Sequence, residues 1–367
     1  MTATLRAARS LPLIRAGRHS ALIGDPLLLA LLILGPILYA ATAAAGAVPQ
    51  ATSHSVSSPT SAPDSADAPL AKARLLLQDG HIEEGERTVR DYLKDHLASA
   101  EAHFLLGYAL FRKVQVDSSA ELKNSAATPQ EEKSRQEYAK QSLAEFTEGA
   151  KYQVPGAFDL KIVSLDYVLL KDYPDADKWL TRSLQKNPAD SESWYYLGRT
   201  KYNENRFAEA ISAFQKYLEL DPRSVKGEDN LGLSYQGLGR TEDATAAYRT
   251  AISWQEHTLM QDPGPFINLG ALLLDQNHAQ EAIPYLQRAI AISPQETRAH
   301  EQLGKAYERL AQFPNAREEF EKALELAPEN SRLHYMLGQV YQKQGLTEKA
   351  KLEFDRSAAL KKENPDR

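Results

Sequence analysis

The sequence predicts an all-α fold, a superhelical solenoid of antiparallel helix pairs with about eight repeats. Similar blocks follow one another every 34 residues, apart from one separation of 38. Their starts are Ala157, Ser191, Val225, Pro263, Thr297 and Ser331. A Leu-Gly pair occupies the seventh and eighth places of five blocks, and an alanine occupies the twentieth place of all six. Because the apolar–polar alternation typical of strands persists nowhere, we expect almost no sheet.

Each block is expected to hold two helices, as residues 191–224 illustrate. Trp194 and Leu197 share one face of a first helix, and Ala210 and Phe214 line a second helix at the same spacing. Pro222 then ends the second helix, because proline lacks an N–H and disfavours helix in the residue before it. One helix pair has apolar surface on two sides, so it needs stacked neighbours to bury both.

Two less regular units precede these blocks, at residues 66–99 and 100–156. The first has Lys72-Ala73 in place of the Leu-Gly pair. The second is about 23 residues longer than the others, and its extra part, roughly residues 112–136, is polar and charged. Thr128 and Glu131 form a capping box with Pro129 at the first helical position. We therefore expect a long second helix from near Pro129 to about Tyr152.

The blocks resemble the tetratricopeptide repeat, a helix–turn–helix unit of 34 residues. Closing prolines support the resemblance, at Pro188, Pro222, Pro294 and Pro328. The resemblance implies that the first helices form a concave surface on which a ligand lies. The predicted solenoid spans residues 66–364, in blocks 66–99, 100–156, 157–190, 191–224, 225–258, 263–296, 297–330 and 331–364. The candidate partner-binding residues implied for this groove are Tyr195, Arg199, Tyr202, Asn203, Asp229, Gln236, Arg298, Glu301, Lys305, Arg309, Arg332, Tyr335 and Gln339.

One specialised groove of the resembling family is not expected here. Some tetratricopeptide domains bind the C-terminal carboxylate of heat-shock chaperones through a Lys, Asn, Asn, Lys, Arg clamp. Lys161 and Lys226 fit that pattern, but Leu165 and Tyr196 stand where the asparagines belong, and Asn230 where the arginine belongs.

The groove toward the N-terminus is predicted to be apolar instead. Leu165, Val168 and Leu169 are expected to lie beside Tyr108 and Phe111. Such a groove would receive an amphipathic helix or an apolar peptide. The alternative is that these side chains pack against the inserted segment.

Residues 1–47 have the pattern of a signal peptide or membrane anchor. Four arginines precede an uncharged apolar run at residues 26–48, and Ala45-Gly46-Ala47 gives a small-x-small cleavage site. A cleaved export signal and an uncleaved anchor both remain open, since the run is long enough to span a bilayer. In either case the repeats are expected to be exported, and in a Gram-negative source to be periplasmic or anchored in the inner membrane facing the periplasm. Residues 48–65 read as a disordered linker rich in Ser, Pro and Ala.

Composition excludes several kinds of site. The chain has no cysteine, so disulfides and thiolate metal sites are excluded. Without residues 1–47 it has 39 basic and 48 acidic residues, a poor balance for nucleic-acid binding. No metalloprotease, phosphate-loop or nucleophile-elbow motif occurs.

His103, His300 and His334 share the fourth place of their blocks with Trp194 and are expected to pack against the next helix. We therefore expect no catalytic residues, metal site or cofactor.

These observations predict a non-enzymatic scaffold or adaptor of the cell envelope that binds a protein or peptide partner in the concave groove. The alternative is an accessory subunit that organises an envelope enzyme or a secretion, pilus or polysaccharide-export machine. A carbohydrate-binding solenoid that uses stacked tyrosines is a third possibility. Membrane contact is expected only through an uncleaved N-terminal segment.

Overall fold

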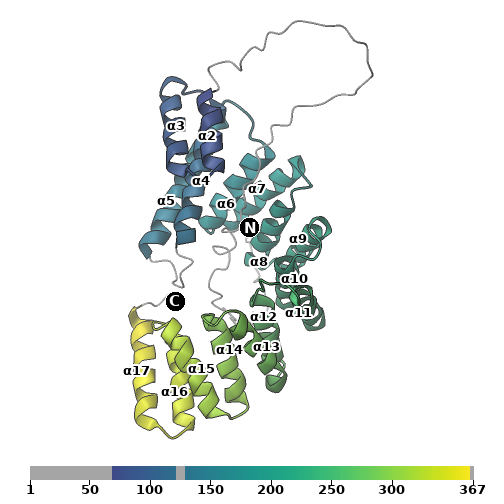
Figure 1. Cartoon of the computed structure of the whole chain (residues 1–367), viewed down its shortest axis with the longest axis vertical. Helices are drawn as coiled ribbons and strands as arrows, with labels where there is room; N and C mark the ends of the chain where they lie inside the picture. Colours follow the sequence, from purple (N-terminus) through teal and green to yellow (C-terminus); the bar gives the residue numbers. More distant parts are fainter. Residues whose placement is uncertain (1–67, 121–128, 364–367) are drawn as a thin grey trace, which may run out of the picture.

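The computed structural model describes residues 68–120 and 129–363, and these residues form sixteen α-helices and no strand. The helices follow one another as antiparallel pairs along an open arc (Figure 1). The predicted leader (1–47) and linker (48–65) lie outside the described residues. Among the helices that are described, none combines the length and apolar character needed to cross a membrane.

Most first helices contact the first helix of the next pair, and the pairs follow the blocks of the sequence. They are α2 (Ala68–Gln78) and α3 (Ile82–Asp95), α4 (Ala100–Ala120) and α5 (Pro129–Gly149), α6 (Ala157–Leu169) and α7 (Tyr173–Lys186), α8 (Ser191–Asn203) and α9 (Phe207–Leu220), α10 (Val225–Gly237) and α11 (Thr241–Gln255), α12 (Gly264–Asp275) and α13 (Ala279–Ile292), α14 (Thr297–Arg309) and α15 (Phe313–Leu326), and α16 (Ser331–Lys343) and α17 (Thr347–Glu363).

The recurring glycine of the Leu-Gly pair is the point of closest approach within a helix pair. A Cβ added at Gly232 would lie 2.5 Å from the ring of Tyr248, and one added at Gly304 would lie 2.6 Å from the ring of Phe320. Both rings are fully buried. A mid-helix glycine costs about 1 kcal/mol relative to alanine. The close packing of a large ring against the bare backbone offsets that cost.

The turn inside each pair uses the same backbone conformation from block to block. The fifteenth residue of every block from residue 157 on has a positive φ. These residues are Lys171, Asn205, Gly239, Asn277, Ala311 and Gly345. Only two of the six are glycine, although the left-handed conformation costs other residues about 1–2 kcal/mol. The packing of the two helices therefore imposes the turn, whatever residue occupies it.

The insertion of the second unit lengthens both of its helices. α4 continues to Ala120, and α5 begins at Pro129, which confirms the start predicted from the capping box. α5 ends at Gly149, so Tyr152 lies in the following turn. The lengthened pair projects beyond its neighbours toward the open side of the arc (Figure 1).

The apolar groove expected near the N-terminus is not open to a helix or peptide, so that prediction is wrong. The alternative holds in part, because Val114 of the inserted segment lies in the same core cluster as the apolar side chains of α6. Phe111, Leu165 and Leu169 are buried in one core cluster, and Val168 is buried in another. The ring of Tyr108 packs edge-on against Phe158, with centroids 5.3 Å apart. The buried side chains hold neighbouring helix pairs together and are not available as a docking surface, whereas Tyr108 is half-buried.

Candidate functional site

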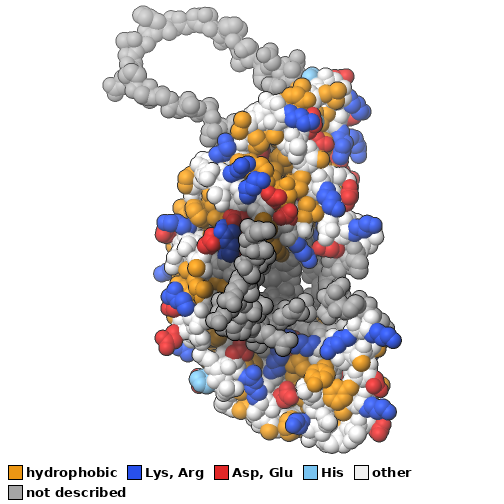
Figure 2. Space-filling view, turned by 180° about the vertical axis from the view of Figure 1, so that it is seen from behind, with side chains coloured by type: hydrophobic (Ala, Val, Ile, Leu, Met, Phe, Trp, Pro, Cys, Tyr) orange, Lys and Arg blue, Asp and Glu red, His pale blue; other side chains and the backbone are white. Residues whose placement is uncertain are grey.

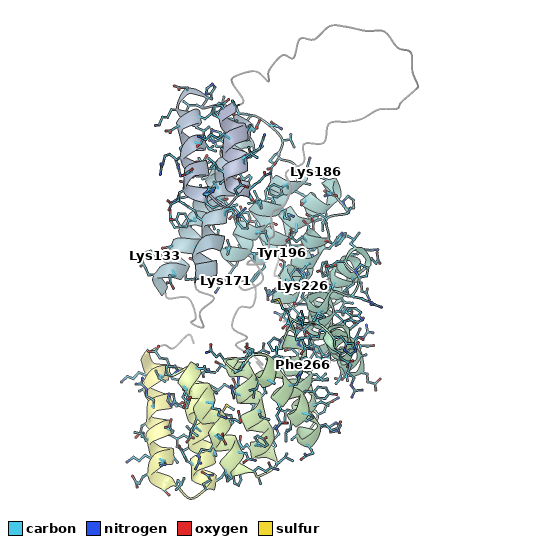
Figure 3. The ribbon with its side chains drawn as sticks, in the orientation of Figure 1. Lys133, Lys171, Lys186, Tyr196, Lys226 and Phe266 are labelled. Atoms are coloured by element: carbon cyan, nitrogen blue, oxygen red, sulfur yellow. The ribbon has the colours of Figure 1, made fainter. Side chains whose placement is uncertain are left out.

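The concave surface is formed by the first helices of successive pairs, and α12 contacts both α10 and α14 along it. Tyr196, Lys226 and Phe266 lie in order along the arc from α8 through α10 to α12 (Figure 3). This surface is the candidate site, because it carries the residues that the sequence predicted to face a ligand.

The thirteen predicted groove residues fall into three classes of exposure. Arg298, Arg309, Arg332 and Tyr335 are exposed. Tyr202, Asn203, Gln236, Lys305 and Gln339 are half-buried. Tyr195, Arg199, Asp229 and Glu301 are buried. The exposed members all lie on α14 and α16, whereas three of the four buried members lie on α8 and α10.

Tyr195 is part of an aromatic cluster within its own repeat, and Lys226 of the next repeat lies against it. Its ring centroid lies 5.2 Å from that of Tyr217 and 5.6 Å from that of Tyr196. Arg199 Nη1 donates a hydrogen bond to its hydroxyl at 3.3 Å, and Lys226 Nζ lies 4.6 Å from the ring centroid. A cation over an aromatic face is attracted by the ring quadrupole. This end of the groove therefore uses its aromatic and basic residues for internal packing.

A chain of polar side chains joins α10, α12 and α14 across the middle of the groove. Asn268 Nδ2 donates to both carboxylate oxygens of Asp229, at 2.9 and 3.0 Å, and Asn268 Oδ1 accepts from Arg298 Nη2 at 3.2 Å. Burial raises the pKa of Asp229 to about 7, and the Asn268 hydrogen bond opposes that rise only in part. Asn268 was not among the predicted groove residues, because it occupies the sixth place of its block and not one of the places taken to face a ligand.

The end of the groove formed by α14 and α16 is rich in cations. Glu301 Oε1 lies 2.5 Å from Lys305 Nζ and 3.8 Å from Arg332 Nε. Burial lowers the pKa of Lys305, and the charge of Glu301 counteracts part of that effect. The exposed arginines at positions 298, 309 and 332 add further positive charge to the same two helices. This part of the groove is suited to contact with acidic groups.

The remaining surface is mixed in charge. On the face seen in Figure 2, Lys and Arg side chains of the described residues are interspersed with Asp and Glu, with apolar patches between them. No continuous basic stripe is visible on that face.

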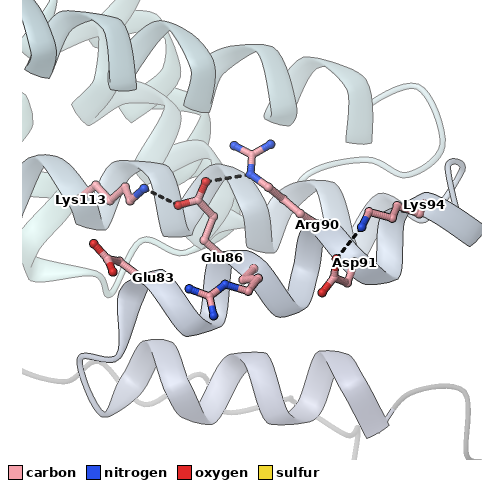
Figure 4. A pocket seen from close by; sticks show the side chains of 7 residues that line it. Glu83, Glu86, Arg90, Asp91, Lys94 and Lys113 are labelled. Atoms are coloured by element: carbon pink, nitrogen blue, oxygen red, sulfur yellow. Dashed lines mark hydrogen bonds and ion pairs between the residues drawn. The ribbon is translucent and has the colours of Figure 1, made fainter.

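A depression of about 430 Å³ lies over α3 and α4 (Figure 4). Lys113 Nζ and Arg90 Nε lie 2.5 and 2.8 Å from the two carboxylate oxygens of Glu86. Burial raises the pKa of Glu86, but the hydrogen bonds from Lys113 and Arg90 outweigh it and bring the pKa below its usual value. The depression is open and its charges pair with one another, so we interpret it as a surface ion-pair network.

The repeated histidines pack against the next helix, as predicted from their spacing. His300 Nδ1 lies 2.6 Å from Glu319 Oε2 of α15, and His334 Nδ1 lies 2.6 Å from Glu353 Oε2 of α17. The period identified this contact, but it did not reveal the carboxylate partner.

Models of the tetratricopeptide repeat match residues 70–132, 191–224, 229–258, 266–293 and 331–364, and a TPR repeat model matches residues 312–345. The chain is 28% identical over 164 residues to DnaJ homolog subfamily C member 7 homolog of Dictyostelium discoideum, covering 41% of this chain and 29% of that protein. It is 35% identical over 99 residues to the human PEX5-related protein, covering 27% and 15%. It is 29% identical over 122 residues to cytochrome c-type biogenesis protein CycH of Pseudomonas aeruginosa, covering 32% and 28%. The chain thus spans less than a third of the length of each of these relatives.

Two solved structures show the same fold. The structure of the APC/C hetero-tetramer Cut9-Hcn1 aligns with a TM-score of 0.52 and 18% identity, covering 83% of this chain and 62% of that chain. That of PilW, described as a widely conserved type IV pilus biogenesis factor, aligns with a TM-score of 0.50 and 19% identity, covering 57% and 94%. Helix pairs, the 34-residue period and matching repeat models agree along the described chain, which belongs to the tetratricopeptide repeat family.

Proposed function

We propose that this chain is a non-enzymatic adaptor of the cell envelope that binds a protein or peptide partner in its concave groove. The observation that carries the proposal is the exposed set of residues on α14 and α16. Arg298, Arg309, Arg332 and Tyr335 lie on two neighbouring first helices of a preformed curved surface. Tyrosine and arginine are among the residue types most enriched in binding hot spots.

The groove arginines are partly held in position before any partner arrives. The hydrogen bond from Arg298 to Asn268 fixes one guanidinium, and Glu301 lies close to Arg332. Side chains that are already ordered lose less conformational entropy on binding. Because arginine pairs with carboxylates in a fork geometry, the preferred partner is a segment that carries acidic side chains.

Two further observations support parts of this proposal. Peroxisomal targeting signal receptor of Saccharomyces cerevisiae is 32% identical over 95 residues, covering 26% of this chain and 15% of that protein, and its name describes a receptor for a targeting signal. The envelope location rests on the arginines and the uncharged run of residues 1–47.

The test is affinity capture of the full-length chain from its native membranes, compared with the Arg298→Glu/Arg309→Glu variant. We expect bound proteins to be lost in this variant, because two groove cations become anions. A Lys351→Glu/Arg356→Glu variant is the matched control, since it makes the same change in charge on the exposed face of α17. Circular dichroism would check that both variants remain folded. Retention of the same partners by the groove variant at low and high salt would contradict the groove proposal.

The second candidate is an accessory subunit that organises an envelope assembly machine. The observation that favours it is the similarity to CycH, whose name describes cytochrome c-type biogenesis. Capture of several subunits of one machine in a fixed ratio would favour this role. Capture of a single soluble client would favour the adaptor.

A further inference from the structure

The fourth residue of several blocks ties its helix to the loop before it. His300, near the start of α14, has its Nε2 atom 3.1 Å from the carbonyl oxygen of Pro294 and its Nδ1 atom 2.6 Å from Glu319 Oε2. The same two contacts recur elsewhere in the chain. They join His334 to Pro328 and Glu353, and His103 to Leu97 and Glu145, at 2.6–3.0 Å. Each carbonyl lies six residues before its ring, in the loop between two repeats.

Both partners of the His300 ring are acceptors. A carbonyl oxygen and an ionised carboxylate have no proton to donate, whereas a neutral imidazole has one N–H and one acceptor nitrogen. Both contacts are therefore hydrogen bonds only when the ring carries two protons. In the neutral ring, one nitrogen lone pair faces an oxygen lone pair, and one of the two bonds is lost.

The block at residues 191–224 contains the same tether without a titratable group. Trp194 occupies the fourth place, and its Nε1 donates to the carbonyl oxygen of Pro188 at 2.9 Å. Ala213 stands where Glu319 stands in the later block. An indole N–H donates at every physiological pH. Proton dependence is therefore a property of the histidine at position 300 and not of the tether itself.

We propose that His300 is a proton-controlled tether, which when protonated holds the first turn of α14 both to the preceding loop and to α15. Loss of one proton removes one of these bonds and loosens the start of the helix. Arg298 lies two residues before His300, so the same proton also helps to position a groove cation. Only this consequence for binding rests on the proposed function.

The charges that face the ring come from α15. The hydrogen bond from Glu319 raises the pKa of His300 and outweighs the opposing effect of burial, while Lys322 opposes the rise weakly. Lys322 Nζ lies 3.9 Å from Glu319 Oε1. Because the pKa is higher in the folded protein, the tether's stabilisation is fully present below the unfolded pKa of about 6.5 and is lost as the pH rises through the folded pKa.

The first test is a histidine NMR titration of the full-length chain between pH 5 and 9. The signal that is absent from a His300→Gln variant identifies the ring. We expect its midpoint to lie above about 6.5, the value of an unperturbed histidine, and to fall in a Glu319→Gln variant. A midpoint at or below the unperturbed value, unchanged by Glu319→Gln, would overturn the proposal.

The second test converts the tether to its tryptophan form with His300→Trp/Glu319→Ala, which copies Trp194 and Ala213. Hydrogen exchange at the start of α14 should speed up in the wild type as the pH rises through the His300 midpoint, after correction for intrinsic exchange. It should stay level in the double variant. A parallel rise in both proteins would refute a role for this proton. Neither test requires a partner, so failure of the capture experiment alone would remove only the proposed function.

Discussion

Tyr195 and Tyr335 occupy the same fifth place of their blocks, yet Tyr195 is 3% exposed and Tyr335 is 46% exposed. Tyr195 packs against Phe214 and Tyr217 of its own repeat, and Lys226 of the next repeat extends over its ring. Tyr335 belongs to the last described pair, where its ring lies beside Phe354 and Lys361 of α17. The place within a repeat therefore sets the direction of a side chain, and the side chains around it, from its own repeat and from the following one, decide whether it is covered.

Two acids at the same fifth place show the same dependence on the side chains around them. Asp229 receives its hydrogen bonds from the neutral amide of Asn268, and burial raises its pKa to about 7. Glu301 instead lies beside two cations, Lys305 of its own helix and Arg332 of the next repeat. Equivalent residues thus differ in the charge of their surroundings because the side chains that contact them differ.

Truncating the two tyrosines tests this comparison with the largest expected effect. Tyr195→Ala should reduce the free energy of unfolding by about 3–5 kcal/mol, as for other buried aromatic residues. Tyr335→Ala should cost about 1 kcal/mol or less, because much of its ring is already in water. Urea denaturation of the two variants measures the difference. Equal losses would show that the difference in exposure does not determine what this place contributes to stability.

The ionisation of Asp229 is expected to give an intermediate change in stability, which depends on pH. Its folded pKa is about 7 and its ordinary value is 3.8, so the folded protein binds this proton more tightly than the unfolded chain. Stability from this group is therefore greatest below pH 4 and falls as the pH rises to about 7. Asp229→Asn should remove this contribution, so that the variant gains stability relative to the wild type across that window. Parallel pH curves of the melting midpoint would contradict the assignment. Asp159 and Asp166, whose pKa values burial also raises, are present in both proteins and cancel in the comparison.

Substitutions in the turns are expected to give the smallest change in stability. Ala311 and Gly239 occupy the same place in their blocks, and both have positive φ. Ala311→Gly should stabilise the protein by about 0.5–1 kcal/mol, because glycine accepts this conformation without steric cost. The reverse change, Gly239→Ala, should destabilise by about 1 kcal/mol, and an added Cβ there would meet no other atom within 4 Å. Thermal melting of both variants would check the pair. A loss of stability in Ala311→Gly would mean that the packing of the pair does not impose the turn.

The fold could be predicted from the sequence because the same residue types recur at the same places in each repeat. The recurring Leu-Gly pair fixed the register of the repeats and lies where the paired helices approach most closely, and Pro129 marked the start of α5. The groove was less predictable. Its polar contacts join residues 30–39 positions apart, such as Asp229, Asn268 and Arg298, and no period encodes those pairings. The apolar groove at Leu165 failed for the same reason, since an apolar residue on an inner helix face is covered when the adjacent pair fits against it.

The helices that contact one another extensively are neighbours or next neighbours in chain order. No such contact has to close a long loop of chain, so folding can begin at any pair and extend in either direction. The same locality governs the response to force. Under tension applied at its two ends, the array would lengthen as pairs detach one at a time, and each remaining pair would keep its own structure. The molecule would therefore extend in steps, and each step would correspond to the detachment of one repeat.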